Sequence, residues 1–173
     1  MSFQQFLQSI RSSRLVSVAK HWDEARRGKR MPGWGDIRPS VIKAQLPIVW
    51  SWRFDDVSQQ FVGRLAGNEI ERAFGQSFRG RAMADVFKDH DYEKFRARHT
   101  RVMQEPALFI GRGLVFRHLK RLDVGERIVM PLAEDGVQGD GVLGATDAKT
   151  RVGQVNDELV REGEEESWFA LEP

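Results

Sequence analysis

Apolar residues near the start of the chain recur at intervals of three and four, which is the period of one helix face. This pattern predicts an amphipathic helix over residues 2–28. Ser12 and Ser13 can divide it into two helices, and Gly28 suits a C-terminal cap. The apolar stripe needs cover, either from the chain's own sheet or from a second copy of the helix. The residues that would form the interface of such a homodimer are Phe3, Phe6, Leu7, Ile10, Leu15, Val18 and Trp22.

The pattern then changes to alternation, which is typical of strands. Residues 48–54 and 60–65 predict a hairpin, and three short helices follow at 68–74, 82–88 and 91–104. Three more strands are predicted at 108–118, 127–133 and 141–146. This order favours an α+β fold in which short helices cross one face of a five-stranded antiparallel sheet.

A concave pocket between that sheet face and the short helices is the expected ligand site. Its candidate lining residues are Trp50, Trp52, Phe61, Arg64, Leu65, Ile70, Phe74, Phe87, Tyr92, Phe95 and His99. His99 shares a helix face with Tyr92 and Phe95, so its ring is expected to face the pocket. It is interpreted as a pocket or core histidine, with a haem ligand as the alternative. Arg64 suits either an ion pair with an acid such as Glu69 or a ligand anion.

Three segments are predicted along the chain: the N-terminal helix (1–28), a domain (29–148) and an acidic tail (149–173). The tail has one helical patch at Asn156–Arg161. Basic residues dominate the first thirty positions and acidic residues the last twenty. These two ends could attract each other, although solvated faces on terminal segments explain the same asymmetry.

Length and composition fit one domain, because 173 residues with 40% hydrophobic content can bury a single core. The chain has no cysteine, which excludes disulfides, thiolate metal sites and thiol nucleophiles, and which suits a reducing cytoplasm. Its longest uncharged apolar run, Ala44–Trp52, is far shorter than the roughly 18–20 residues that span a bilayer. The N-terminus lacks the pattern of a signal peptide. We therefore expect a soluble cytoplasmic protein.

The motifs give little support for catalysis. The four histidines are dispersed, and neither a nucleophile elbow nor a phosphate-binding glycine loop is present. No catalytic residue and no metal site are therefore expected. A small enzyme using His99 with Asp85 or Asp89 is an alternative, but it would lack a nucleophile or second base. Nucleic-acid binding is not expected, because acidic residues intersperse the basic ones from Asp55 onward.

The basic segment Arg26–Arg30, which reads RRGKR, offers a further alternative. Adjacent guanidinium groups bind phosphates well, so Arg26, Arg27 and Arg30 could hold a cyclic dinucleotide. The polar turn that usually completes such a site is missing. A basic helix end that complements the helix dipole is the favoured interpretation.

Two ordered blocks carry a family resemblance. The first consists of Trp22, Asp23, Arg26, Gly28, Arg30, Pro32, Asp36, Pro39, Leu46 and Pro47. The second consists of Arg64, Leu65, Gly67, Asn68, Ile70, Phe74, Gly75, Gly80 and Arg81, and a late hairpin adds Met130, Pro131, Leu132, Asp135, Gly136, Leu143 and Gly144. Over residues 18–148 the chain resembles the PAS fold, and in particular a single-domain PAS family common in alphaproteobacteria that was once a domain of unknown function.

The resemblance implies a stand-alone bacterial module for signal transduction that binds a small ligand or partner proteins and has no catalytic output. The homodimer is expected from the stripe of the N-terminal helix. It does not specify a cofactor, since PAS domains variously hold haem, flavin, carboxylic acids or nothing. The absence of cysteine argues against a light-sensing flavin adduct. The partner protein is not specified either.

Overall fold

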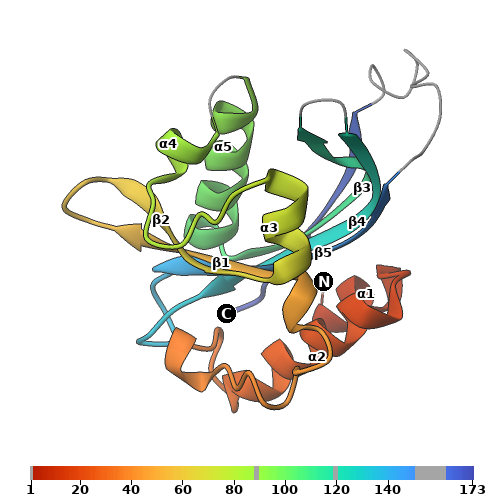
Figure 1. Cartoon of the computed structure of the whole chain (residues 1–173). Coiled ribbons are helices and arrows are strands. Elements are labelled where there is room, and N and C mark those ends of the chain that lie inside the picture. The colour runs from red at the N-terminus through yellow and green to blue at the C-terminus, as the bar shows by residue number, and fades with distance from the viewer. Residues whose placement is uncertain (1, 88–89, 119–120, 151–162) are drawn as a thin grey trace.

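The computed structural model describes residues 2–87, 90–118, 121–150 and 163–173 of the chain. One twisted antiparallel sheet forms the middle layer, and helices cover both of its faces (Figure 1). The N-terminal helices α1 (Phe3–Ser9) and α2 (Ser13–Arg26) lie on one side. The other side carries α3 (Asn68–Phe74), α4 (Met83–Val86) and α5 (His90–Gln104). The predicted helical patch Asn156–Arg161 lies outside the described residues.

The described strands follow the spatial order β2-β1-β5-β4-β3-β6. The first two, β1 (Val49–Asp55) and β2 (Gln60–Ala66), form the predicted hairpin. The next three are β3 (Ala107–His118), β4 (Arg121–Leu132) and β5 (Gly141–Thr150). β5 pairs with β1, so the N-terminal hairpin lies beside a strand from much later in the chain.

A sixth strand corrects the predicted five-stranded sheet. Residues Glu164–Ala170, which the sequence assigned to the acidic tail, form β6 and pair antiparallel with β3 at the sheet edge. Three consecutive glutamates open this strand and hide its alternation. The apolar side chains that follow pack on the body of the protein, Phe169 against Phe6 and Trp168 against Phe109.

Alternation along the strands divides the interior into two apolar clusters. On β3, Leu108 and Ile110 face α1 and α2, while Phe109 between them faces α5. On β4 the same rule sends Ile128 toward the N-terminal helices and Val129 toward the opposite side. The period of two therefore gives each helical layer its own apolar surface.

The apolar stripe of the N-terminal helices is covered by the chain's own sheet. Phe6, Leu15, Val18 and Trp22 are completely buried, Phe3 and Ile10 nearly so, and Leu7 is half-buried against the same cluster. These seven residues are thus not a free surface, and their assignment to a homodimer interface is corrected. The alternative, in which the helix covers the sheet, is what the structure shows. Hydrophobic burial removes the stripe from water within one chain.

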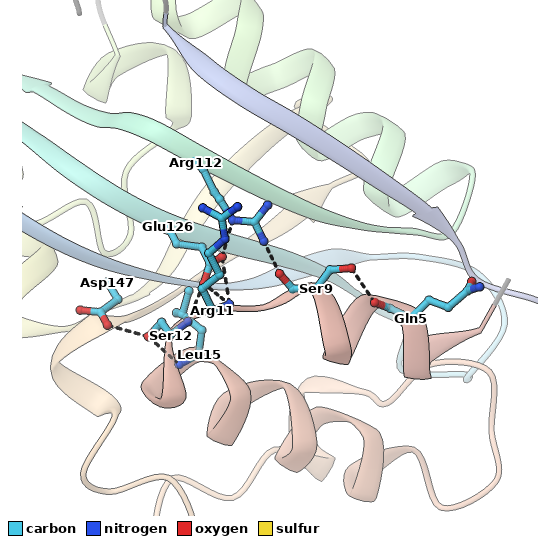
Figure 2. Close-up of polar contacts among 8 residues, drawn as sticks. All are labelled: Gln5, Ser9, Arg11, Ser12, Leu15, Arg112, Glu126 and Asp147. Carbon is cyan, nitrogen blue, oxygen red and sulfur yellow. Dashed lines mark hydrogen bonds and ion pairs between the residues drawn. The ribbon is translucent and has the colours of Figure 1, made fainter.

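A carboxylate on β4 fixes the linker between α1 and α2 (Figure 2). Glu126 accepts hydrogen bonds from the backbone N–H groups of Arg11 and Ser12, at 3.0 and 2.9 Å, and from Arg112 Nε at 2.7 Å. Arg112 also donates to the backbone oxygen of Ser9. Ser12 in turn caps α2 by accepting from the backbone N–H of Leu15, and its hydroxyl donates to Asp147 on β5. The helix break predicted at Ser12–Ser13 is therefore an anchoring point on the sheet.

In the described part of the chain, no helix combines the length and the apolar character needed to cross a membrane.

Candidate ligand cavity

An aromatic cavity lies between the sheet and the layer formed by α3, α4 and α5. Its volume is about 20 Å³, which is enough for one water molecule. It is lined by Trp50, Trp52, Phe74, Phe78, Phe87, Phe95, Phe116, His99, Arg127 and Thr146. Trp50 and Trp52 project from the same face of β1, and Trp52 stacks on Phe78 with the ring centroids 4.5 Å apart.

Most of the predicted pocket residues gather here. Trp50, Trp52, Phe74, Phe87, Phe95 and His99 line the cavity. Phe61, Ile70 and Tyr92 belong to the same apolar cluster without lining it. The face common to Tyr92, Phe95 and His99 on α5 is therefore the one that packs on the sheet.

Leu65 and Arg64 lie elsewhere, which corrects two of the predicted pocket positions. The pairing of β1 with β2 shifts at this point, so that Ser51 opposes Leu65 while Trp52 opposes Gly63. This bulge inserts one residue and sends Leu65 to the face of α1 and α2. The guanidinium of Arg64 lies 4.8 Å from the ring centre of Trp34, outside the cavity. The Glu69 carboxylate, suggested as its partner, instead pairs with Arg14 at 3.1 Å.

Phe78, Phe116, Arg127 and Thr146 line the cavity but were not predicted. Phe78 sits in the glycine-punctuated segment between α3 and α4, which has no periodicity from which its direction could be inferred. The position of Arg127 could have been predicted from the sequence. It stands next to the apolar Ile128 in a strand with two buried faces, so its side chain points to the opposite face from Ile128. Its pKa is lowered to about 10, with burial as the main cause and Glu164 opposing it. The guanidinium is therefore charged at neutral pH.

His99 has one satisfied ring nitrogen and one free one. Nδ1 lies 2.7 Å from the backbone oxygen of Phe95, and since a carbonyl oxygen only accepts, Nδ1 carries the hydrogen. Nε2 is buried and has no hydrogen-bond partner among the described residues. Trp50 stacks on the imidazole with the ring centroids 5.3 Å apart. Burial, followed by the charge of Arg98, lowers the pKa of His99 to about 3, so the ring is neutral with an available lone pair at Nε2.

The buried imidazole predicts that acid destabilises the fold. The pKa of His99 is about 3 when folded and about 6.5 when unfolded, so the unfolded chain binds a proton first as the pH falls. The contribution to the free energy of unfolding is complete above about pH 6.5 and is lost progressively as the pH falls toward 3. Urea titrations between pH 7.5 and pH 4.5 should show a shallower decline for His99→Phe than for the wild type. Equal declines would contradict a neutral buried imidazole.

A second, larger pocket adjoins the cavity. It has a volume of about 180 Å³ and is lined by Glu69, Ile70, Arg72, Ala73, Phe116, Asp123, Thr146 and Ala148. Phe116 and Thr146 line both spaces, so these two side chains separate them. Phe116 rests edge-on against Phe74 of α3 with a centroid distance of 5.3 Å. Phe116 is therefore the aromatic ring that the outer pocket and the inner cavity have in common.

The comparison with protein families matches residues 10–147 to the model described as a PAS domain. The chain belongs to the PAS domain family. The match covers most of the chain, and the α+β fold with its antiparallel sheet and short helices is that expected of a PAS domain. No curated protein and no solved structure is significantly similar to the chain. Family membership indicates a sensory or interaction module.

Haem does not fit this PAS cavity as the structure shows it. The cavity of about 20 Å³ accommodates a water molecule rather than a macrocycle, and both Trp50 and Phe61 pack on the imidazole of His99. The small-enzyme alternative named two acids as partners of His99. Asp85 is exposed on α4, and Asp89 lies outside the described residues.

The arginines of the RRGKR segment have separate neighbours in this PAS domain. Arg26 pairs with Asp23 and lies over the ring of Trp22, while Arg30 donates to the backbone oxygen of Leu171 at 2.7 Å. Arg27 ends α2 in the left-handed conformation, with φ of 48°. No shared anion clamp is formed by the three guanidinium groups.

Proposed function

We propose that this PAS domain is a sensory module that binds a small molecule in the aromatic cavity beside His99. The observation that carries the proposal is the buried Nε2 atom, which has no hydrogen-bond partner among the described residues. A buried polar atom without a partner costs about 1–3 kcal/mol, and a donor group on a ligand would remove that cost. Ten residues, mostly aromatic, would enclose the apolar part of such a ligand.

The outer pocket supports the proposal, because it supplies space next to a cavity that holds one water molecule. A ligand larger than water would displace Phe116 and extend toward Ala73 and Ala148. Occupancy would then alter the packing between α3 and the sheet. The proposal includes no chemical reaction, so the signal would leave the domain as a change of conformation.

A thermal-shift titration with phenol, indole, benzamide and benzoate tests this function. We expect at least one compound to raise the melting temperature saturably, since a ligand at a hundredfold excess over its Kd stabilises a fold by about 2.7 kcal/mol. The shift caused by phenol, indole and benzamide, which carry a donor group, should fall sharply in His99→Phe, which keeps an aromatic ring but lacks the acceptor. Val57→Ala is the matched control, because Val57 is 95% exposed.

Two results would refute a small-molecule site. One is the absence of any shift at millimolar concentrations of all four compounds. The other is an equal shift by the donor compounds phenol, indole and benzamide in the wild type and in His99→Phe, which would place their binding away from Nε2.

A further inference from the structure

Two buried arginines share one buried carboxylate at the junction of α5, β4 and β6. Arg98 donates to Glu164 Oε2 at 2.9 Å, and Arg127 Nε lies 2.8 Å from Glu164 Oε1. The three side chains are only 2–4% exposed. Glu166, which is one-third exposed, receives a second hydrogen bond from Arg98 at 2.9 Å. The acidic C-terminal segment therefore pairs with the interior of the domain.

Hydrogen-bond donors outnumber acceptors in this cluster. Arg98 Nε and NH1 are buried without a hydrogen-bond partner in the described part of the chain. Arg127 Nε is close to Glu164 but not aligned for a hydrogen bond. Aromatic faces lie beside the charges, with the guanidinium of Arg98 4.3 Å from the ring centre of Phe109 and that of Arg127 5.1 Å from that of Phe95. Two planar guanidinium groups with spare donors can bind a carboxylate.

The backbone of β3 is shaped for the carboxylate. At Gly111, a Cβ atom would lie 1.9 Å from Glu164 Oε1 and 2.6 Å from its Cδ, so any larger residue would occupy the place of the carboxylate. Glu164 reaches this place from β6, where it stands opposite Gly113. The absence of a side chain at Gly111 thus leaves room for the carboxylate that contacts the two arginines.

The cluster is continuous with the aromatic cavity, because Arg127 belongs to both. The cavity therefore has a cationic end at Arg127, aromatic walls and a hydrogen-bond acceptor at His99 Nε2. The cationic end and the aromatic walls suit a carboxylate with an apolar body, while Nε2 would accept from a donor group carried on that body. In the structure, the Glu164 carboxylate occupies the space beside Arg127 at this cationic end. Glu164 belongs to β6, an edge strand that pairs with β3 alone.

We propose that Arg98, Arg127 and the bare backbone at Gly111 form a carboxylate-binding site, which Glu164 fills in the absence of ligand and which a small aromatic carboxylic acid takes over. This proposal rests on the proposed function. It adds the chemical class of the ligand and the effect of ligand binding on β6. Because the carboxylate of Glu164 has to leave the two arginines, the first residues of β6 lose an anchor, and the proposal includes a loosening of this strand from β3 as the ligand binds. Ligand binding is thereby coupled to loosening of the C-terminal strand.

Benzoate and benzamide have the same ring but differ in charge, so comparing them separates the contribution of the carboxylate from that of the apolar body. Calorimetric titration gives the affinity of each compound. Glu164→Gln keeps the shape of the side chain but removes the competing charge, so it should bind benzoate at least about tenfold more tightly than the wild type. Glu165→Gln is the matched control, since Glu165 is exposed on the same strand, and it should bind as the wild type does. Benzamide should bind at least about tenfold more weakly than benzoate to Glu164→Gln.

Hydrogen exchange of the wild type reports the second half of the proposal without relying on a variant. Saturating benzoate should accelerate exchange of the backbone amides in residues 164–170 and leave those of β5 protected. Equal benzoate affinity in the wild type and Glu164→Gln, or binding without faster exchange in β6, would overturn the proposal. If phenol or benzamide binds as tightly as benzoate, the ligand site stands and its carboxylate specificity is wrong. If none of the compounds binds, the proposed function itself fails.

Discussion

Alanine in place of Trp22 is expected to lower the free energy of unfolding by about 3–5 kcal/mol, the usual loss for a large aromatic residue in a core. Trp22 is completely buried between α2 and the sheet, and it stacks on Phe3 with the ring centroids 5.9 Å apart. Its indole N–H donates to the backbone oxygen of Pro131 at 2.9 Å. The substitution removes apolar contact area and also leaves that oxygen without its donor. Equilibrium unfolding in urea measures the change.

Trp22→Phe separates these two contributions. Phenylalanine keeps most of the apolar contact but cannot donate to Pro131, so we expect a loss of about 1–3 kcal/mol, the cost of a buried acceptor without a partner. Val41→Ala, at a position that is 56% exposed, is the control and should change stability little. A loss below about 1 kcal/mol for Trp22→Ala would mean that the N-terminal helices do not pack on the sheet as described.

Glu126→Ala is expected to destabilise the fold by a similar amount, about 3–5 kcal/mol, because it removes one partner of a buried ion pair. The Glu126 side chain is 8% exposed, and that of Arg112, its partner, 14%. The substitution would leave the Arg112 charge and the N–H groups of Arg11 and Ser12 without their acceptor. Urea denaturation gives the total loss. Hydrogen exchange at Ser12 should increase more than exchange in the middle of α2.

The exposed pair of Arg101 and Glu105 provides the control for this experiment. Its side chains are 47% and 64% exposed, and exposed pairs of this kind contribute about 0–1 kcal/mol. Glu105→Ala should therefore have a small effect. If Glu126→Ala is no more destabilising than Glu105→Ala, the carboxylate does not anchor the helix linker.

Periodicity carried most of the fold. Apolar residues spaced three and four apart predicted the helix that ends before Pro106 and the stripe at the N-terminus, and a spacing of two predicted the hairpin. These spacings depend on nearby residues alone. Part of the aromatic lining of the cavity was predictable in the same way, since Trp50 and Trp52 share a strand face and Phe95 and His99 a helix face.

The failures were non-local. The bulge that turns Leu65 to the other face depends on how β1 and β2 pair, and the sequence of β2 alone shows an unbroken alternation from Phe61. The partner that allows the charge of Arg127 to be buried is Glu164, thirty-seven positions later in the chain. A run of glutamates predicts a solvent-exposed tail. That one of them pairs with buried arginines becomes evident only in the folded structure. Long-range charge pairing leaves no periodic signal.

The first and last elements of the chain also share one apolar cluster, since Phe3 and Phe6 of α1 and Leu171 beyond β6 belong to it, and Phe6 packs edge-on against Phe169. Contacts between such distant residues slow folding, because a long loop has to close before they form. During synthesis, α1 leaves the ribosome well before β6, whose neighbourhood completes its surroundings. Nascent chains therefore expose part of the N-terminal apolar stripe until β6 has been made, and during that interval a chaperone has most to bind.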